Sequence, residues 1–131
     1  FDKPGLDGSG KCDAEATLVP QDRVYGVVYE IDSSQKPQLD KAEGLGRGYA
    51  QKDVEVISGE AVLSAVTYYA TRKDRSLRPY RWYKEYVIAG ARENSLPPEY
   101  IGLIERIDSI EDSDSRRAER ARALLHGNSA A

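Results

Sequence analysis

The chain has 131 residues, of which 40% are hydrophobic and 31% are charged, a composition that suits one globular domain and excludes a wholly disordered chain. Its 19 Lys and Arg residues stand against 22 Asp and Glu residues, so the net charge of -3 draws it neither to nucleic acid nor to anionic lipid. The sequence has no signal-peptide pattern and no run of 18 apolar residues. We therefore expect a cytoplasmic protein that does not insert into membranes.

Cysteine and histidine are too scarce for several common chemistries. Cys12 has no second cysteine with which to form an internal disulfide, and the single His126 lies in a polar tail. These two residues exclude the usual Cys/His zinc sites and a Ser-His-Asp triad, and we expect no metal and no cofactor. The sequence opens with Phe1 and contains no Met, so we expect the natural protein to be longer at its N terminus.

The N-terminal third predicts two strands after a Gly- and Pro-containing loop over residues 1–10. Residues 12–19 carry small and β-branched side chains. In residues 23–31 large apolar side chains occupy every second position from 25 to 31, so that as a strand they would share one face. That face consists of Tyr25, Val27, Tyr29 and Ile31. Because the opposite face also carries valines, we expect the second strand to be central, in a barrel or beneath a helix.

A short helix is predicted over residues 35–43. Ser33 and Ser34 offer an N-cap, Pro37 is expected to interrupt the helix early, and Gly44 supplies a C-terminal stop.

A hairpin follows the helix. Residues 49–57 and 61–70 have strand composition, and the connection over residues 58–60 contains the glycine that a tight turn requires.

The C-terminal half predicts helices. One begins at Pro79 and ends near Asn94, and a second amphipathic helix follows Pro97 and Pro98 and extends through Asp108. These elements complete a domain that we assign to residues 1–110.

Residues 111–131 form a separate, charged C-terminal helix or tail in this prediction. From Asp112 onward charges dominate, so we expect an exposed helix that frays toward Ala131. Its one apolar face would consist of Ala118, Ala121 and Leu125.

The segment LDKAEGLGRGY, residues 39–49, is the most informative for chemistry because it places Glu43 at the end of a helix inside a Gly-rich turn. The partial negative charge of a helix C-terminus disfavours an exposed acid by about 0.3–1 kcal/mol and strengthens its hold on a proton. Glycines at 44, 46 and 48 let the backbone approach a ligand closely. Glu43 is therefore suited to proton transfer near neutral pH, although a solvated glutamate beside a helix cap is the more common arrangement.

Four segments, taken in order, resemble the gamma-glutamylcyclotransferase family. They are VYGVVY at residues 24–29, LDKAEGLGRGY at 39–49, AVTYYA at 65–70 and WYKEYVIAGARENSLPPEY at 82–100. The last matches the family's Gly-Ala-x-Glu-x-x-Leu-Pro ending through Gly90, Ala91, Glu93, Leu96 and Pro97. Each motif alone is weak, but four in the family's order are more specific.

The resemblance implies an α+β fold, a small mixed β-barrel with flanking helices. It also implies a reaction in which the α-amine of a γ-glutamyl compound attacks its own γ-carbonyl and releases 5-oxoproline and an amine. Glu43 falls at the family's catalytic position, and Tyr49 and Tyr83 match tyrosines that face the substrate. Alternatively, Tyr49 simply begins a strand and Tyr83 belongs to the helix core.

The sequence departs from the family at one point. Family members have a Tyr-Gly-Ser-Asn loop whose backbone amides bind the γ-glutamyl carboxylate, and nothing in residues 1–131 matches that loop. We expect this loop in a longer natural chain. If it is truly absent, the alternative is a catalytically inactive module of the same fold that binds a small molecule or a protein.

A third alternative arises from the basic stretch 72–84, where Arg and Lys residues alternate with Tyr and Trp as in some single-stranded nucleic-acid sites. The acidic overall charge argues against it, so we expect a small-molecule γ-glutamyl substrate and no nucleic acid. The sequence leaves open which amine the substrate carries, and whether the protein is a monomer or a homodimer.

Overall fold

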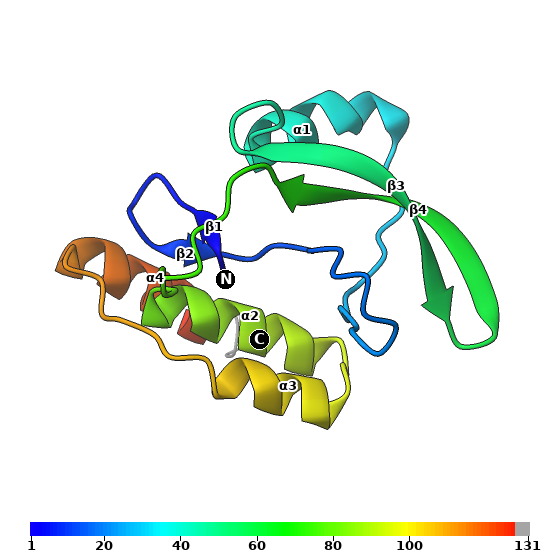
Figure 1. Ribbon diagram of the computed structural model, residues 1–131. Coiled ribbons are helices and arrows are strands. Elements are labelled where there is room, and N and C mark those ends of the chain that lie inside the picture. Colours follow the sequence, from blue (N-terminus) through cyan, green and yellow to red (C-terminus); the bar gives the residue numbers. More distant parts are fainter. Residues whose placement is uncertain (128–131) are drawn as a thin grey trace.

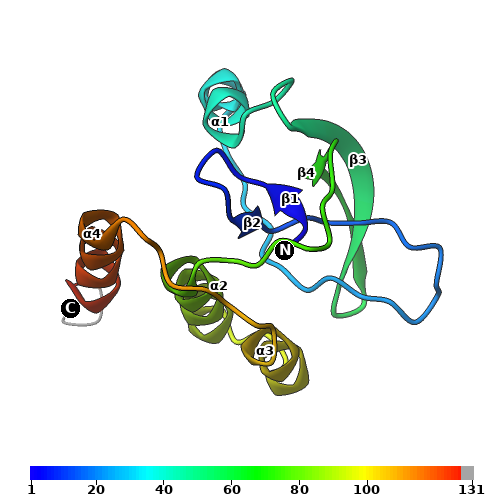
Figure 2. The ribbon, with the colours of Figure 1, turned by 60° about the vertical axis from the view of Figure 1, so that its left-hand side comes forward.

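The structure, a computed structural model, describes residues 1–127. Figure 1 shows the β3–β4 hairpin and α1 on one side, the helices α2, α3 and α4 on the other, and the small β1–β2 hairpin between them. Figure 2 shows the same separation from a second direction. In chain order the elements are β1 (Lys3–Pro4), β2 (Gly10–Lys11), the 3-10 helix η1 (Ser33–Gln35), α1 (Lys36–Glu43), β3 (Tyr49–Ser58), β4 (Ala61–Ala70), α2 (Arg81–Glu93), α3 (Pro98–Glu105) and α4 (Ser115–Gly127).

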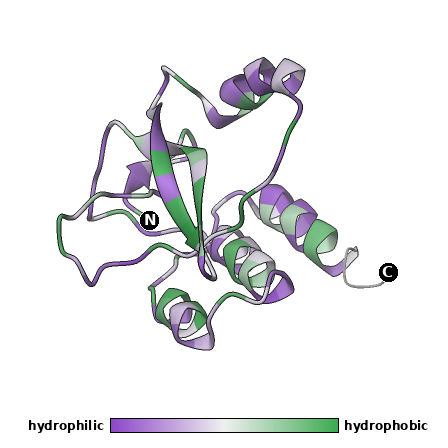
Figure 3. Cartoon of the chain, turned by 90° about the vertical axis from the view of Figure 1, so that its right-hand side faces the viewer, coloured by the Kyte–Doolittle hydropathy of each residue, from purple (hydrophilic) through white to green (hydrophobic). Residues whose placement is uncertain are grey.

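The predicted α+β class is confirmed, whereas a closed barrel is not. Within residues 1–127 the strands form two separate antiparallel pairs, β1 with β2 and β3 with β4. The long hairpin has the predicted register, from Tyr49 opposite Ala70 to Ser58 opposite Ala61, and Gly59 turns the chain at a φ of 60°. Polar and apolar residues alternate over residues 53–56 of β3, whereas β4 is mostly apolar, and Figure 3 shows both hydrophilic and hydrophobic stretches on the hairpin.

The two strands predicted within residues 12–31 are wrong. This segment has no strand, and its apolar side chains are exposed, with Val24 at 62% and Tyr29 at 73% of full exposure. Alternation determines only which side chains share a face, whereas a strand also needs a neighbour for its backbone hydrogen bonds. None of the four strands in residues 1–127 pairs with this segment.

Helix α1 forms where the sequence predicts it, with different details at its start. Ser33 and Ser34 lie in η1, whose N-terminal cap is Asp32 with its side chain accepting a hydrogen bond from the Ser34 amide. The N-cap of α1 itself is Gln35, which makes no side-chain capping bond. Pro37 lies in the first turn, where its missing N–H costs nothing, so it does not interrupt the helix. Gly44 ends α1 in a left-handed conformation, as predicted.

The predicted helices α2 and α3 are confirmed, and the core lies where α2 meets its neighbouring helices. The buried apolar residues are Ala70, Tyr80, Ala91, Ile104, Ala118 and Ala121. Two of them, Ala118 and Ala121, lie on the predicted apolar face of α4, which packs on α2, while most other side chains of α4 are exposed, in line with the predicted charged helix. The predicted fraying toward Ala131 lies outside the described residues.

Candidate functional site

The structure brings Tyr49 and Tyr83 together at the backbone of Cys12. The Tyr49 hydroxyl donates to the Cys12 carbonyl oxygen at 2.8 Å, and the Cys12 amide donates to the Tyr83 hydroxyl oxygen at 3.2 Å. Tyr49 begins β3, Tyr83 lies in α2, and Cys12 directly follows β2. The site therefore joins both halves of the fold.

Sequence reasoning missed Cys12 as the meeting point. No local signal marks it, because the contacts span 37 residues to Tyr49 and 71 residues to Tyr83.

Burial and nearby negative charge keep both phenols protonated. Burial is the main cause that raises the pKa of Tyr49 to about 12, and negative charge at Cys12 and Glu43 adds to it. Burial likewise raises the pKa of Tyr83 and that of the Cys12 thiol. At neutral pH the site therefore presents two neutral hydroxyls and a protonated thiol, which is a poor nucleophile.

Glu43 is the last residue of α1, and its side chain is exposed. Its negative charge adds to the raised pKa of Tyr49, which follows it in the chain across the Gly-rich turn. We expect a proton-transfer group to be sheltered from bulk water, and the Glu43 side chain is not, so its role stays a prediction. The helix ends at Gly44 and the chain turns away, which leaves the carboxylate open to water.

The Gly-rich turn after α1 carries the chain from Glu43 to Tyr49. Gly44, Gly46 and Gly48 have φ values of 74°, 80° and 121°, which side-chain-bearing residues rarely adopt. The Gly46 amide donates to the Tyr49 carbonyl oxygen at 2.9 Å and closes the turn. Glycine at these positions thus allows a tight loop that returns to the base of α1.

A groove of about 660 Å³ lies away from these residues, between the irregular segment and α3. Tyr25 and Tyr100 meet there with ring centroids 5.0 Å apart. Neither Glu43, Tyr49 nor Tyr83 lines it. The sequence did not indicate this groove, because it predicts strands over residues 12–19 and 23–31, where the structure has irregular chain.

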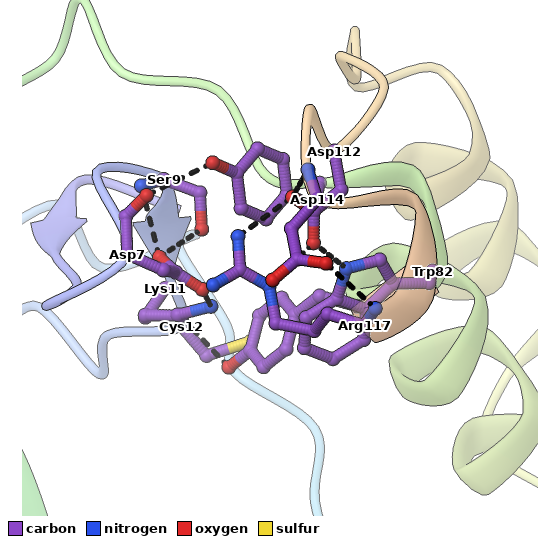
Figure 4. A network of polar contacts seen from close by, with 10 residues as sticks. Asp7, Ser9, Lys11, Cys12, Trp82, Asp112, Asp114 and Arg117 are labelled. Carbon is purple, nitrogen blue, oxygen red and sulfur yellow. Dashed lines mark hydrogen bonds and ion pairs between the residues drawn. The ribbon is translucent and has the colours of Figure 1, made fainter. Parts of the chain in front are cut away.

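The aromatic and basic residues at the start of α2 have partners within the protein. Trp82 Nε1 donates to the Asp112 carboxylate at 2.9 Å (Figure 4), and Arg81 pairs with Glu85 at 3.1 Å. Tyr80 is buried. The Trp82–Asp112 hydrogen bond and an ion pair between Arg81 and Glu111 at 3.3 Å attach α2 to the segment that precedes α4, whereas the Arg81–Glu85 pair lies within α2.

Within residues 1–127, no three His, Cys, Asp or Glu side chains are grouped so that they could hold a metal ion. In the same range, no helix has both the length and the apolar character needed to cross a membrane.

The model of the AIG2-like family matches residues 23–104, which is more than half of the chain. The chain belongs to the gamma-glutamylcyclotransferase/AIG2-like family. The match includes Glu43, Tyr49 and Tyr83 but not Cys12. It also includes residues 23–31, which are irregular in this structure.

Curated members of the gamma-glutamylcyclotransferase family are similar over 96 residues. Gamma-glutamylcyclotransferase from Bos taurus is 35% identical and that from Homo sapiens 34% identical, in each case over 72% of this chain and 50% of the relative. The chain thus spans about half the length of these relatives.

Solved structures support the same family. A gamma-glutamyl cyclotransferase structure superposes with a TM-score of 0.59 at 27% identity, over 63% of this chain and 50% of the other. An uncharacterized protein from Homo sapiens superposes with a TM-score of 0.57 at 29% identity, over 61% and 48% of the two chains.

Proposed function

We propose that this chain catalyses a gamma-glutamylcyclotransferase reaction. The observation that carries the proposal is the position of Glu43 at the end of α1, in the segment LDKAEG (residues 39–44), which matches the family's Leu-Asp-x-x-Glu-Gly pattern. Homologues of 34–35% identity that are named for this activity support it.

The reaction is an intramolecular transfer of an acyl group. The α-amine nitrogen forms a bond to the γ-carbonyl carbon, the amide bond to the leaving amine breaks, and one proton passes from the attacking nitrogen to the leaving nitrogen. No water is consumed. Because both reacting groups belong to one molecule, holding the substrate folded supplies much of the rate enhancement.

Glu43 is the group that we assign to the proton transfer. As a carboxylate it accepts the proton of the attacking amine, and as a carboxylic acid it delivers that proton to the leaving amine. Its exposure in the free chain means that bound substrate must exclude water from it, which would raise its proton affinity.

Tyr49 and Tyr83 are proposed as the substrate-binding residues. Each hydroxyl is held by Cys12, and each oxygen keeps a lone pair that can accept a hydrogen bond from a substrate N–H. Both phenols are protonated at neutral pH, so they add no negative charge that would compete with Glu43 for the proton.

The test incubates the chain with a panel of γ-glutamyl amino acids, peptides and amines and measures 5-oxoproline. Glu43→Gln keeps the size of the side chain but cannot take a proton, and we expect it to lower kcat on the order of 10²–10⁴-fold. Glu60→Gln, an exposed position in the hairpin turn, is the control and should leave kcat unchanged. Absence of 5-oxoproline from every compound, or equal turnover by Glu43→Gln, contradicts the proposal.

A further inference from the structure

The β1–β2 hairpin carries two lysines directly opposite one another, Lys3 on β1 and Lys11 on β2. Directly opposed like charges destabilise an antiparallel pair of strands. Each ammonium, however, lies over a phenol ring of the candidate site. The Nζ atom of Lys3 is 4.5 Å from the ring centroid of Tyr49. The Nζ atom of Lys11 is 4.5 Å from the ring centroid of Tyr83. The attraction of each cation to an aromatic face therefore offsets the repulsion between the two lysines.

Lys11 is held in this position by Asp7, in the loop of the same hairpin (Figure 4). Its Nζ pairs with Asp7 Oδ2 at 2.8 Å, and the two side chains are only 18% and 16% exposed. The other carboxylate oxygen, Oδ1, accepts hydrogen bonds from the Ser9 amide at 3.0 Å and from the Ser9 hydroxyl at 2.7 Å. Ser9 is fully buried. The hairpin loop thus determines where the Lys11 ammonium lies.

Three aromatic rings at the start of α2 surround the Lys11 ammonium. Tyr83 is the nearest, and the ring centroids of Trp82 and Tyr80 lie 5.2 and 5.9 Å from Nζ. The Tyr83 ring also meets the rings of Trp82 and Phe1 edge to face, at 6.0 Å in each case. A phenol that is packed in this way and covered by a cation has little freedom to rotate.

We infer that Lys11 is a positioning residue, which holds the Tyr83 phenol in the orientation that brings its hydroxyl to Cys12. The inference rests on the proposed function, in which Tyr83 binds the substrate. It adds to the site a residue that lies outside the match to the family model, residues 23–104. Cys12 follows Lys11 directly, and its amide donates to the Tyr83 hydroxyl oxygen at 3.2 Å. One short segment therefore fixes both the ring and the hydroxyl of this phenol.

Removal of the charge at position 11 should weaken substrate binding and leave the chemical step intact. Lys11→Met keeps a long aliphatic side chain and removes the ammonium, so the Tyr83 ring loses the cation over its face. We expect the KM for γ-glutamyl-alanine to rise about 3- to 10-fold and kcat to stay nearly unchanged. Lys11→Arg keeps the cation and should restore most of the affinity. Lys52→Met is the matched control, because Lys52 Nζ lies 5.0 Å from the ring of Tyr69 on the β3–β4 hairpin.

Two backbone amides report on the orientation of Tyr83 without any substrate. The Cys12 amide bonds to the Tyr83 hydroxyl, whereas the Gly10 amide bonds to the Arg78 carbonyl oxygen at 2.9 Å and reports on the hairpin as a whole. Hydrogen exchange measured by NMR should be faster at Cys12 in Lys11→Met and unchanged at Gly10. Tyr83→Phe removes the hydroxyl and gives the rate that a lost bond produces. Lys52→Met should change neither amide.

A double variant tests whether Lys11 acts through the Tyr83 hydroxyl. Lys11→Met combined with Tyr83→Phe should have the KM of Tyr83→Phe alone, and additive effects of the two changes would contradict the inference. Thermal unfolding first establishes that Lys11→Met is folded, and Lys11→Gln provides a second uncharged variant. Failure of both to fold would show that Lys11 serves stability alone and would overturn the inference.

Hydrogen exchange separates this inference from the proposed reaction. If Lys11→Met loses protection at Cys12 and keeps it at Gly10, the inference about Tyr83 holds even when no 5-oxoproline forms, and only the proposed function fails. Equal protection of Cys12 in Lys11→Met and in the wild-type chain overturns the inference. So does an equal loss at Cys12 and Gly10, or a wild-type Cys12 amide without protection.

Discussion

Arg117 holds Asp112 through two hydrogen bonds, from Nε to Oδ2 and from Nη2 to Oδ1, each 2.6 Å long (Figure 4). The Asp112 side chain is fully buried and also accepts hydrogen bonds from Trp82 Nε1 and from the Asp114 amide. One carboxylate thus joins α4, the segment before it and α2. Such paired geometry is specific to the planar guanidinium of arginine.

Arg117→Met should destabilise the protein and release α4, because the variant leaves a buried carboxylate without its cation. We expect the midpoint of thermal unfolding to fall by several degrees. Amide hydrogen exchange should become faster in α4 than in the β3–β4 hairpin. Arg116→Met, at an exposed neighbouring position, is the control, and an equal effect of both variants would show that the ion pair is unimportant.

Acid should weaken the same contact. The bond from Arg117 is the main cause that holds the pKa of Asp112 well below its ordinary value of 3.8. Below about pH 4 the unfolded chain therefore binds this proton more readily than the folded chain, so the stabilisation is complete above that pH and is lost as the pH falls. Urea unfolding at pH 7, 5 and 3 measures this loss, which should be smaller in Asp112→Asn.

High pH should lower the free energy of unfolding through Tyr49. Burial raises the pKa of this residue from 10.0 to about 12. Between these two values the folded chain keeps a proton that the unfolded chain has lost, so stability is full below pH 10 and decreases as the pH rises toward 12. Water screens the half-exposed side chain, so we expect an effect on the order of 1 kcal/mol. Urea unfolding at pH 9 and 11 should show a smaller decrease for Tyr49→Phe, whereas the exposed control Tyr29→Phe should match the wild-type chain.

Gly48→Ala should destabilise the protein more than Gly46→Ala. Both positions have positive φ, and the backbone strain costs about 1–3 kcal/mol at each. Only at position 48 does the added Cβ meet the Lys3 side chain, whereas no atom lies within 4 Å at position 46. Chemical unfolding measures the difference, and a greater loss from Gly46→Ala would contradict the placement of Lys3.

Local interactions made several elements predictable from the sequence. Helix α1 ends at Gly44 because glycine adopts the left-handed conformation without strain, and the β3–β4 hairpin turns at Gly59 for the same reason. Helix α2 follows from apolar residues at helical spacing. Glu43 was singled out from its local position before a glycine that ends the helix, whereas Tyr49 was named from the family resemblance, and the roles of both residues stay predictions.

Tertiary structure alone decided the remainder. Residues 23–31 have the pattern of a strand, but a strand forms only when a neighbouring strand accepts its backbone hydrogen bonds. The four strands of the described residues pair with one another and none lies beside this segment. Tyr83 contacts Cys12 across a separation of 71 residues in the chain, and Lys3 contacts Tyr49 across a separation of 46. No local sequence pattern encodes contacts between residues so far apart. The amino-acid sequence by itself therefore determined the family and the locally encoded elements, whereas packing between distant segments determined which side chains meet at the site.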